Sequence, residues 1–242
     1  MKTTLNITLM LMLAGLCITP GCKKTTNTSP GGGGSTGLLK TMIQVVSTPN
    51  GTDSTITNLA YDSQNRVVSQ VATTKINSTL FGIDTTTYTF GTGSVMQYSS
   101  TTGVTVTYTL NSLGFRSSDN LGDTWTYNTA GYMTQSTQAA AGSTTTYTYN
   151  SSNQLTMETA VSNSGTNTYT FTYATNPIGK AGSSWSQGQS TGDQFATDVE
   201  VQNGTTTTLT ATYTLNAQGQ LGETSIASSG SASPVVTYFI YY

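Results

Sequence analysis

Aromatic and aliphatic residues alternate with threonine along most of the chain after residue 55. Tyr147 and Tyr149, for example, lie two positions apart with threonines between and around them. Residues two apart share one face of a β-strand, so such a segment carries apolar side chains on one face and threonine on the other. The same alternation at residues 104–110 and 209–215 predicts further amphipathic strands, and we find no helical periodicity.

A recurring turn signal separates these segments: Asn or Asp, then two residues, then Gly or Asn. Asn150 and Asn153 form one copy. The other copies begin at Asp62, Asn111, Asn128 and Asn216, and a degenerate copy begins at Gly91. The Asn or Asp side chain can accept a hydrogen bond from the backbone two residues on, and Gly or Asn tolerates the left-handed conformation of a type I turn followed by a bulge. The signal therefore predicts β-hairpins.

A second kind of connection, rich in Gly and Ser, lies between successive Asn-type turns, at residues 102–103, 120–123, 141–142, 164–165 and 203–204. Because the two kinds alternate, successive strands should run up and down. Starting with a strand at 39–47, the spacing gives roughly 14 to 16 strands of ordinary length. The sequence thus predicts an all-β fold, an antiparallel up-and-down meander that is barrel-like or rolled, as one domain over residues 39–242.

Composition narrows the possible functions. Only 7% of the 242 residues are charged, the formal net charge is −2, and the sequence contains no His. Few and scattered basic residues argue against nucleic-acid binding. Without His, the Ser-His and Cys-His nucleophile sites and common zinc sites are excluded. We therefore expect a protein that is not an enzyme and that has no metal or cofactor.

The N-terminus has the layout of a secretory signal peptide, with Lys2, an apolar run at 9–14 and the pair Gly21 and Cys22. A small residue directly before a Cys resembles a bacterial lipoprotein signal, which implies a signal peptide at 1–21 and a lipid on Cys22. The two residues before Gly21 depart from the usual pattern, and the alternative is an ordinary signal peptide with an incidental Cys. Residues 23–38 have the composition of a flexible Gly/Ser/Thr tether, with ends about 20 to 25 Å apart.

The hairpin repeats resemble the YD repeats of RHS-type proteins, and Tyr61 and Asp62 reproduce the dipeptide that names them. The whole layout of lipoprotein signal, polar tether and Tyr-rich hairpins resembles a family of bacterial lipoproteins with a porin-like fold. The resemblance covers residues 39–242. It implies a large antiparallel barrel-like meander and an outer-membrane location with a lipid anchor, on the periplasmic face or the cell surface. It implies no activity.

Candidate ligand-binding residues are Trp185, Trp125 and Asp193, because exposed aromatic rings stack on sugars and carboxylates accept sugar hydroxyls. Trp185 and Asp193 belong to a long Gly-rich segment, 176–193, which is either a binding loop or a disordered insertion. The alternative for Trp125 is packing in the core. Further carboxylates could serve a carbohydrate-active enzyme or, in part, calcium, but their spacing selects no pair; they are Asp119, Asp123, Asp198, Glu200 and Glu223.

The apolar face has two possible directions, and they lead to different functions. If it points inward, the protein is a lipid-anchored envelope protein that acts as a non-enzymatic binding or structural module, with glycans and other envelope components as candidate partners. If it points into lipid, the protein is an outer-membrane β-barrel pore. The end of the chain, Val236 to Tyr242, resembles the aromatic C-terminal signal of such barrels. A carbohydrate-active enzyme is the weaker third alternative.

Overall fold

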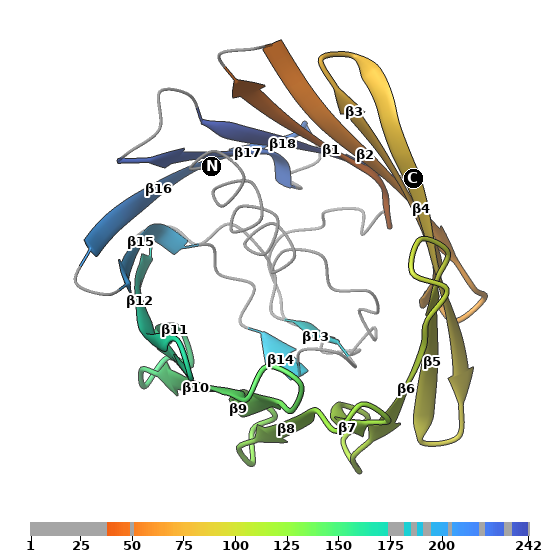
Figure 1. The fold of residues 1–242 in the computed structure, drawn as a ribbon, viewed down its shortest axis with the longest axis vertical. Coiled ribbons are helices and arrows are strands. Elements are labelled where there is room, and N and C mark those ends of the chain that lie inside the picture. The colour runs from red at the N-terminus through yellow and green to blue at the C-terminus, as the bar shows by residue number, and fades with distance from the viewer. Residues whose placement is uncertain are drawn as a thin grey trace.

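Strand pairing closes the chain into one ring. The computed structural model describes residues 38–48, 51–173, 182–184, 188–190, 195–202, 205–217, 221–229 and 234–241. Sixteen strands form a closed barrel in the order β1-β18-β17-β16-β15-β12-β11-β10-β9-β8-β7-β6-β5-β4-β3-β2, and Figure 1 shows the ring along its axis. Every paired neighbour is antiparallel, so the predicted all-β up-and-down meander is confirmed.

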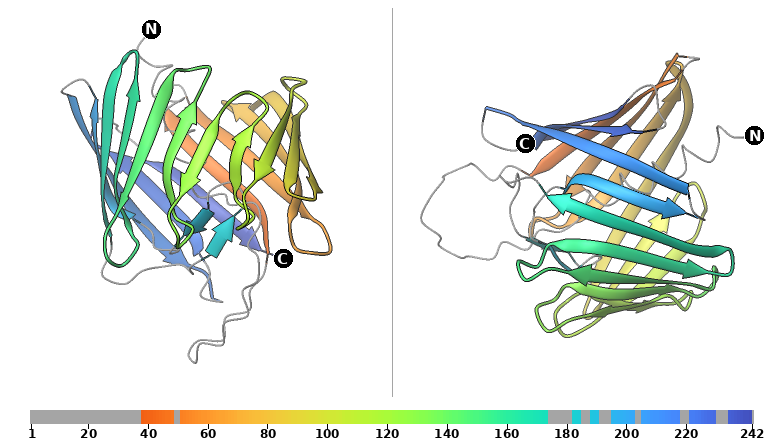
Figure 2. Two further views of the ribbon diagram at one scale, coloured as in Figure 1. Left: turned by 90° about the horizontal axis from the view of Figure 1, so that it is seen from below. Right: turned by 90° about the vertical axis from the view of Figure 1, so that its left-hand side faces the viewer.

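The barrel strands have the following bounds: β1 Leu39–Thr48, β2 Gly51–Tyr61, β3 Val67–Ile76, β4 Thr79–Gly91, β5 Ser94–Ser99, β6 Thr105–Leu110, β7 Arg116–Asp119, β8 Thr124–Tyr127, β9 Met133–Gln138, β10 Ser143–Tyr149, β11 Leu155–Ser162, β12 Gly165–Tyr173, β15 Phe195–Gln202, β16 Thr205–Leu215, β17 Leu221–Ser228 and β18 Val235–Tyr241. They cross the barrel obliquely, as the side views in Figure 2 show. The first strand was expected at 39–47 and the others between the marked turns, which is where they lie.

A small second sheet interrupts the meander between β12 and β15. β13 (Gly182–Ser184) and β14 (Gly188–Ser190) pair only with each other, so β15 pairs with β12 across the gap. Both short strands belong to the segment 176–193 that was expected to be irregular. Seen along the barrel axis, they lie inside the ring (Figure 1).

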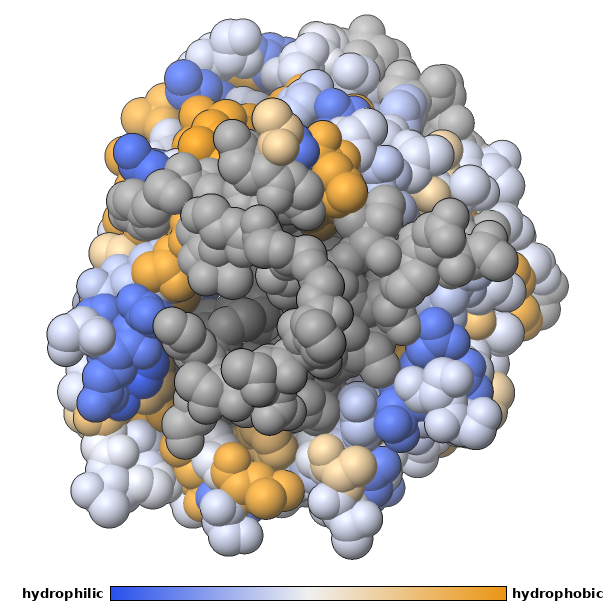
Figure 3. Space-filling view, turned by 180° about the vertical axis from the view of Figure 1, so that it is seen from behind, coloured by the Kyte–Doolittle hydropathy of each residue, from blue (hydrophilic) through white to orange (hydrophobic). Residues whose placement is uncertain are grey.

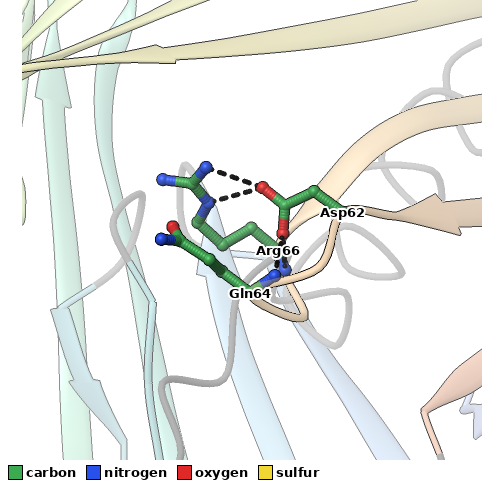
Figure 4. Close-up of polar contacts among 3 residues, drawn as sticks. All are labelled: Asp62, Gln64 and Arg66. Carbon is green, nitrogen blue, oxygen red and sulfur yellow. Dashed lines mark hydrogen bonds and ion pairs between the residues drawn. The ribbon is translucent and has the colours of Figure 1, made fainter.

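The Asn-type turns have the predicted chemistry. At Asn150, Oδ1 accepts hydrogen bonds from the backbone N–H groups of Ser152 (2.9 Å) and Gln154 (3.0 Å), and Asn153 has a φ of 62°. In the turn at Asp62, Oδ1 likewise accepts from the backbone N–H groups of Gln64 and Arg66. Asp62 Oδ2 lies 2.7 Å from the Arg66 guanidinium (Figure 4). The backbone bond donated by Arg66 leads the contacts that lower the pKa of Asp62. Local sequence is therefore enough to set these hairpins.

Two turns differ from the prediction. The connection at 120–123 is of the same kind as the Asn-type turns, because Asp119 Oδ1 accepts from the N–H groups of Leu121 and Asp123, both at 2.9 Å. In the degenerate copy at Gly91, the left-handed residue is Gly93, with a φ of 71°, instead of the residue three after the start. That turn has only two residues between β4 and β5, which leaves no place for the longer pattern.

The aromatic face of the sheet is the inner one. Rings from strands that are not neighbours meet on this face: Tyr108 on β6 and Trp125 on β8 have centroids 6.0 Å apart. Side chains converge on the concave side of a cylinder, and the fully buried Val95 lies opposite Tyr108 on the same face. In Figure 3, hydrophobic residues (orange) lie mainly between the pale rim of the barrel and its centre. The outer face is therefore the threonine face.

The outer face is not uniform. Of three aligned rows across β18, β1, β2, β3 and β4, two are mostly apolar, and we call the apolar members of all three the apolar wall: Ile43, Val45, Ile56, Val71, Leu80, Ile83, Val236, Tyr238 and Ile240. The outer rows across β8 to β12 are mostly threonine, and we call them the threonine wall: Thr124, Thr126, Thr137, Thr144, Thr146, Thr148, Thr159, Thr166, Thr168 and Thr170. The two walls are built from the same repeat but present different surfaces.

Candidate functional site on the inner wall

A bulge after each Asn-type turn brings polar residues to the inner wall. In the repeat that ends at Tyr149, Tyr149 pairs with Leu155 but Thr148 pairs with Met157, so the strand gains one residue and its side chains exchange faces. Met157 therefore points outward and Glu158 points inward, opposite Tyr147. Equivalent bulges follow the turns at Asp62, Asn111, Asn128 and Asn216.

The same shift in every repeat pairs a large or aromatic inner residue with a polar one. The pairs are Leu59 with Gln70, Tyr108 with Asp119, Trp125 with Ser136, Tyr147 with Glu158, and Tyr213 with Thr224. Some of these residues also bond to their neighbours, since the Tyr147 hydroxyl lies 3.2 Å from Ser136 Oγ. Rings beside hydroxyls, amides and carboxylates make the inner wall a surface for ligands that have both apolar faces and polar edges.

Two acids face each other across one tyrosine on this wall. Glu158, Tyr169 and Glu200 lie directly opposite one another on β11, β12 and β15. The Tyr169 hydroxyl hydrogen-bonds to the Glu200 carboxylate, and burial together with this acid raises the pKa of Tyr169 to about 12. Burial alone raises the pKa of Glu158 from 4.5 to about 7. Near neutral pH, Glu158 can therefore donate or accept a hydrogen bond.

An arginine occupies the inner wall on the adjoining strands. The Arg116 guanidinium lies 4.1 Å from the centroid of the Trp125 ring, a cation–π distance, and burial lowers its pKa. Burial also raises the pKa of Tyr127 to about 12, with Arg116 beside it counteracting part of the rise. Burial raises the pKa of Tyr147, Glu158 adds to the rise, and Arg116 counteracts part of it. We call Arg116, Tyr147, Glu158, Tyr169 and Glu200 the inner belt.

Several buried polar atoms lack hydrogen-bond partners, and all of them belong to inner-wall residues. They are Arg116 Nε, Tyr127 Oη, Glu200 Oε1 and Thr224 Oγ1. Glu200 is only 5% exposed. Buried polar atoms in native proteins are almost always paired with protein, water or ligand. Among the residues that the structure describes, these unpaired atoms are therefore concentrated on the inner wall.

Tyrosine hydroxyls join neighbouring hairpins at the edge of this wall. Tyr149 donates to the backbone carbonyl of Met133 at 2.8 Å, and Tyr173 donates to that of Leu155 at 2.8 Å. Each acceptor is the first residue of a strand, where the bulge interrupts the ladder. The tyrosine that precedes the turn thus supports the wall, which is a structural role.

The residues predicted from sequence are placed as follows. Trp125 is on the inner wall, 8% exposed, with Arg116 against its ring. Trp185, Asp193 and Cys22 lie outside the described residues, as does the boundary drawn at 21. Among the candidate carboxylates, Glu200 lies in the inner belt, Asp119 caps a turn, and Glu223 is on the outer face opposite Tyr238.

The sequence analysis did not select Arg116 or Glu158. Simple alternation from Tyr147 and Tyr149 would place Glu158 on the outer face, and only the bulge brings it inward. Its position nine residues after Tyr149, equivalent to Ser136 after Tyr127, was the signal available. Within the described residues, no group of three or more His, Cys, Asp or Glu could hold a metal ion. The same part of the chain contains no helix long and apolar enough to cross a membrane.

Comparisons with solved structures define the class of the fold. A porin-like protein from Bacteroides uniformis ATCC 8492 superposes with a TM-score of 0.68 at 17% identity, covering 88% of this chain and 100% of the other. A porin-like protein from Bacteroides vulgatus ATCC 8482 gives a TM-score of 0.55 at 9% identity, covering 83% and 97%. No family model and no curated protein matches the sequence, so the comparison with YD repeats stays a resemblance. The chain has the fold of these porin-like β-barrels.

Proposed function

We propose that the protein is a cell-envelope β-barrel that binds a saccharide-type ligand on its inner wall without catalysis, and that it stands in water, tethered through a lipid on Cys22. The observation that carries this proposal is the inner belt. Its tyrosines offer ring faces, and its acids and arginine offer hydrogen bonds beside them. Sugars have the matching surface, with apolar C–H faces and hydroxyl edges.

The size of the barrel supports a ligand in the interior. A closed barrel of sixteen strands is too wide for its side chains to fill. The unpartnered atoms of Arg116, Glu200 and Thr224 lie on the wall that bounds this interior. These polar groups are already desolvated in the folded protein, so a ligand that binds there does not have to desolvate them. The hydroxyls of the ligand would supply the hydrogen-bond partners that these groups lack.

The outer face supports the tethered arrangement over a spanning one. A membrane-spanning barrel carries a continuous apolar band toward lipid and a polar interior. Here most of the described aromatic residues line the inside, with Tyr98 and Tyr238 on the outer face, and the threonine wall has only Met157 and Val161 as apolar members of its rows. Lipid chains beside a row of hydroxyls would lack the apolar contact that such a band provides.

Titration calorimetry with a panel of neutral, amino and acidic oligosaccharides tests the ligand class. We expect the wild-type protein to bind at least one class, and Glu158→Gln to weaken that binding by roughly tenfold, since a hydrogen bond to a charged group is lost. The control is Glu223→Gln on the outer face, which should bind as the wild type does. Binding that is absent from every sample, or equal in both variants, contradicts the proposal.

An outer-membrane pore is the second candidate, and two observations favour it. Both solved structures described above are porin-like proteins, and the apolar wall presents aliphatic residues outward over five neighbouring strands. A Cys22→Ala variant, exported and cleaved by the ordinary route, distinguishes the candidates. The tethered barrel predicts a periplasmic protein that is soluble or is released from membranes by alkaline extraction. Resistance to alkaline extraction, with a heat-dependent shift on gels and conductance in planar bilayers, would establish the pore.

A further inference from the structure

The apolar wall ends in a hairpin tip with unusually exposed apolar side chains. Phe81 is 73% exposed, Ile83 57% and Leu80 56%. Phe81 lies at a bulge, since Gly82 pairs with Thr74 and Leu80 pairs with Lys75. In Figure 1 the β3–β4 hairpin stands at the outer margin of the ring. Water-soluble proteins seldom leave such a cluster uncovered unless it contacts a partner or a membrane.

This cluster is continuous with the wall behind it. Ile83 lies opposite Thr73, which lies opposite Ile56, which in turn lies opposite Ile43. The three outer rows of this wall contain one charged residue, Lys75, and no acid. A lone lysine beside apolar residues suits a surface of anionic headgroups over hydrocarbon.

The entry point of the chain specifies which partner fits. The barrel begins at Leu39 on β1, between β18 and β2, so the N-terminal segment joins this wall at the barrel end opposite the β3–β4 tip. The predicted tether between Cys22 and that point spans about 20 to 25 Å. A lipid on Cys22 would hold the apolar wall at the bilayer surface.

We propose that the apolar wall, led by Leu80 and Ile83, lies on the surface of the lipid bilayer to which the chain is tethered. The barrel then meets lipid on one side only, and the threonine wall faces water. This inference rests on the proposed function, in which the barrel is tethered and does not span the membrane. A second copy of the chain is the other possible occupant, and the experiment distinguishes it.

Vesicle flotation of the exported full-length protein with Cys22→Ala, which has no lipid of its own, tests the inference. The vesicles contain phosphatidylethanolamine with phosphatidylglycerol. We expect this parent protein to float with the vesicles and to be released by alkaline extraction. Adding Leu80→Ser and Ile83→Ser should weaken vesicle binding about tenfold or more, because two large apolar groups no longer leave water. The control pair Met157→Ser and Val161→Ser, on the threonine wall, should bind as the parent does.

Four results would overturn the inference or its premise. The inference fails, while the tethered barrel stands, if the parent remains soluble and does not float. The same holds if both pairs of substitutions weaken vesicle binding equally. It also fails if sedimentation shows dimers that Leu80→Ser and Ile83→Ser dissociate while neither protein floats, since the wall then binds a second copy. If the parent floats but resists alkaline extraction, the tethered barrel itself is wrong. Unchanged oligosaccharide binding by the Leu80 and Ile83 variant would show that its barrel is folded.

Discussion

The apolar wall and the threonine wall are made from the same strand and turn repeat, yet they differ on the face that looks away from the barrel. In the row through Ile43, Ile56 and Ile83 the outward residues are mainly aliphatic. In the row through Thr126, Thr146 and Thr168 they are mainly hydroxylic. Since inward residues alone maintain the barrel, this asymmetry indicates that the two sides meet different surroundings.

The inner faces behind the two walls differ as well. Behind the threonine wall lie Tyr147, Glu158 and Tyr169, with the two acids of the inner belt and many ring contacts. Behind the apolar wall lie Met42 and Leu59 among polar residues such as Gln44, Thr57 and Gln70. Both inner faces are thus mixed, and the buried acid Glu158 beside two tyrosines distinguishes the inner face behind the threonine wall.

Replacing Glu158 by Gln should give the largest effect, on the inner side of the threonine wall. The pKa of Glu158 is about 7 in the folded protein and near 4.5 when unfolded, so the folded state binds more protons between these values. Stability is therefore highest below pH 4.5 and falls as the pH rises toward 7, by roughly 3 kcal/mol. Glu158→Gln should remove this loss and be the more stable protein at pH 8.

Chemical unfolding at pH 4.5 and pH 8 measures this difference. Glu223→Gln, on the outer face, is the matched control and should keep the pH dependence of the wild type. If Glu158→Gln keeps it too, another group is responsible for the change, and the comparison of the two inner faces loses its main electrostatic argument.

Asn150→Ala should give the next effect, at the β10–β11 turn of the threonine wall. The side chain accepts two backbone N–H groups and donates to Gln154 Oε1 at 2.9 Å. Losing these bonds should lower the free energy of unfolding by about 1 to 2 kcal/mol. Ser151→Ala, an exposed change in the same turn, should stay within about 0.5 kcal/mol. Equal losses in denaturant titrations would mean that the Asn side chain does not hold the turn.

These turns are the part of the fold that local sequence predicts best. The hydrogen bonds of Asp62, Asn111, Asn128 and Asn150 all lie within four residues of the side chain that makes them. Strand number and direction follow from turn spacing, so the meander could be predicted. Closure of the ring could not, because the pairing of β1 with β18 joins the two ends of the barrel and no local signal specifies it.

The candidate site was harder to predict for a reason that can be named. Alternation predicts faces only where pairing is regular, and each bulge exchanges the faces of the strand that follows. Thus Leu155 and Met157 share parity in the sequence but lie on opposite faces, which places Glu158 inside. The division into two walls depends on the pairing register across five strands, so the sequence of single strands could not predict it either.

Ser78→Gly should stabilise the tip of the apolar wall. Asn77 and Ser78 connect β3 to β4 with φ values of 50° and 66°, the conformation in which Gly is preferred at the second position. Removing the side chain should raise the free energy of unfolding by about 0.5 to 1 kcal/mol. Ser152→Gly is the control, because Ser152 does not have a positive φ and Gly there should give a small loss. Destabilisation by both changes would contradict the turn geometry.

An exchange between the two walls should change stability least and test their contrast most directly. Ile83→Thr on the apolar wall and Thr146→Ile on the threonine wall alter exposed outward positions, so each should shift the free energy of unfolding by less than about 0.5 kcal/mol. Retention on a hydrophobic chromatography column should nevertheless shorten for Ile83→Thr and lengthen for Thr146→Ile, because each change alters the apolar area that meets the column. If Ile83→Thr leaves retention unchanged, the apolar wall is covered in solution. Its outward chemistry would then serve contact within or between protein chains, and lipid would no longer explain why the two walls differ.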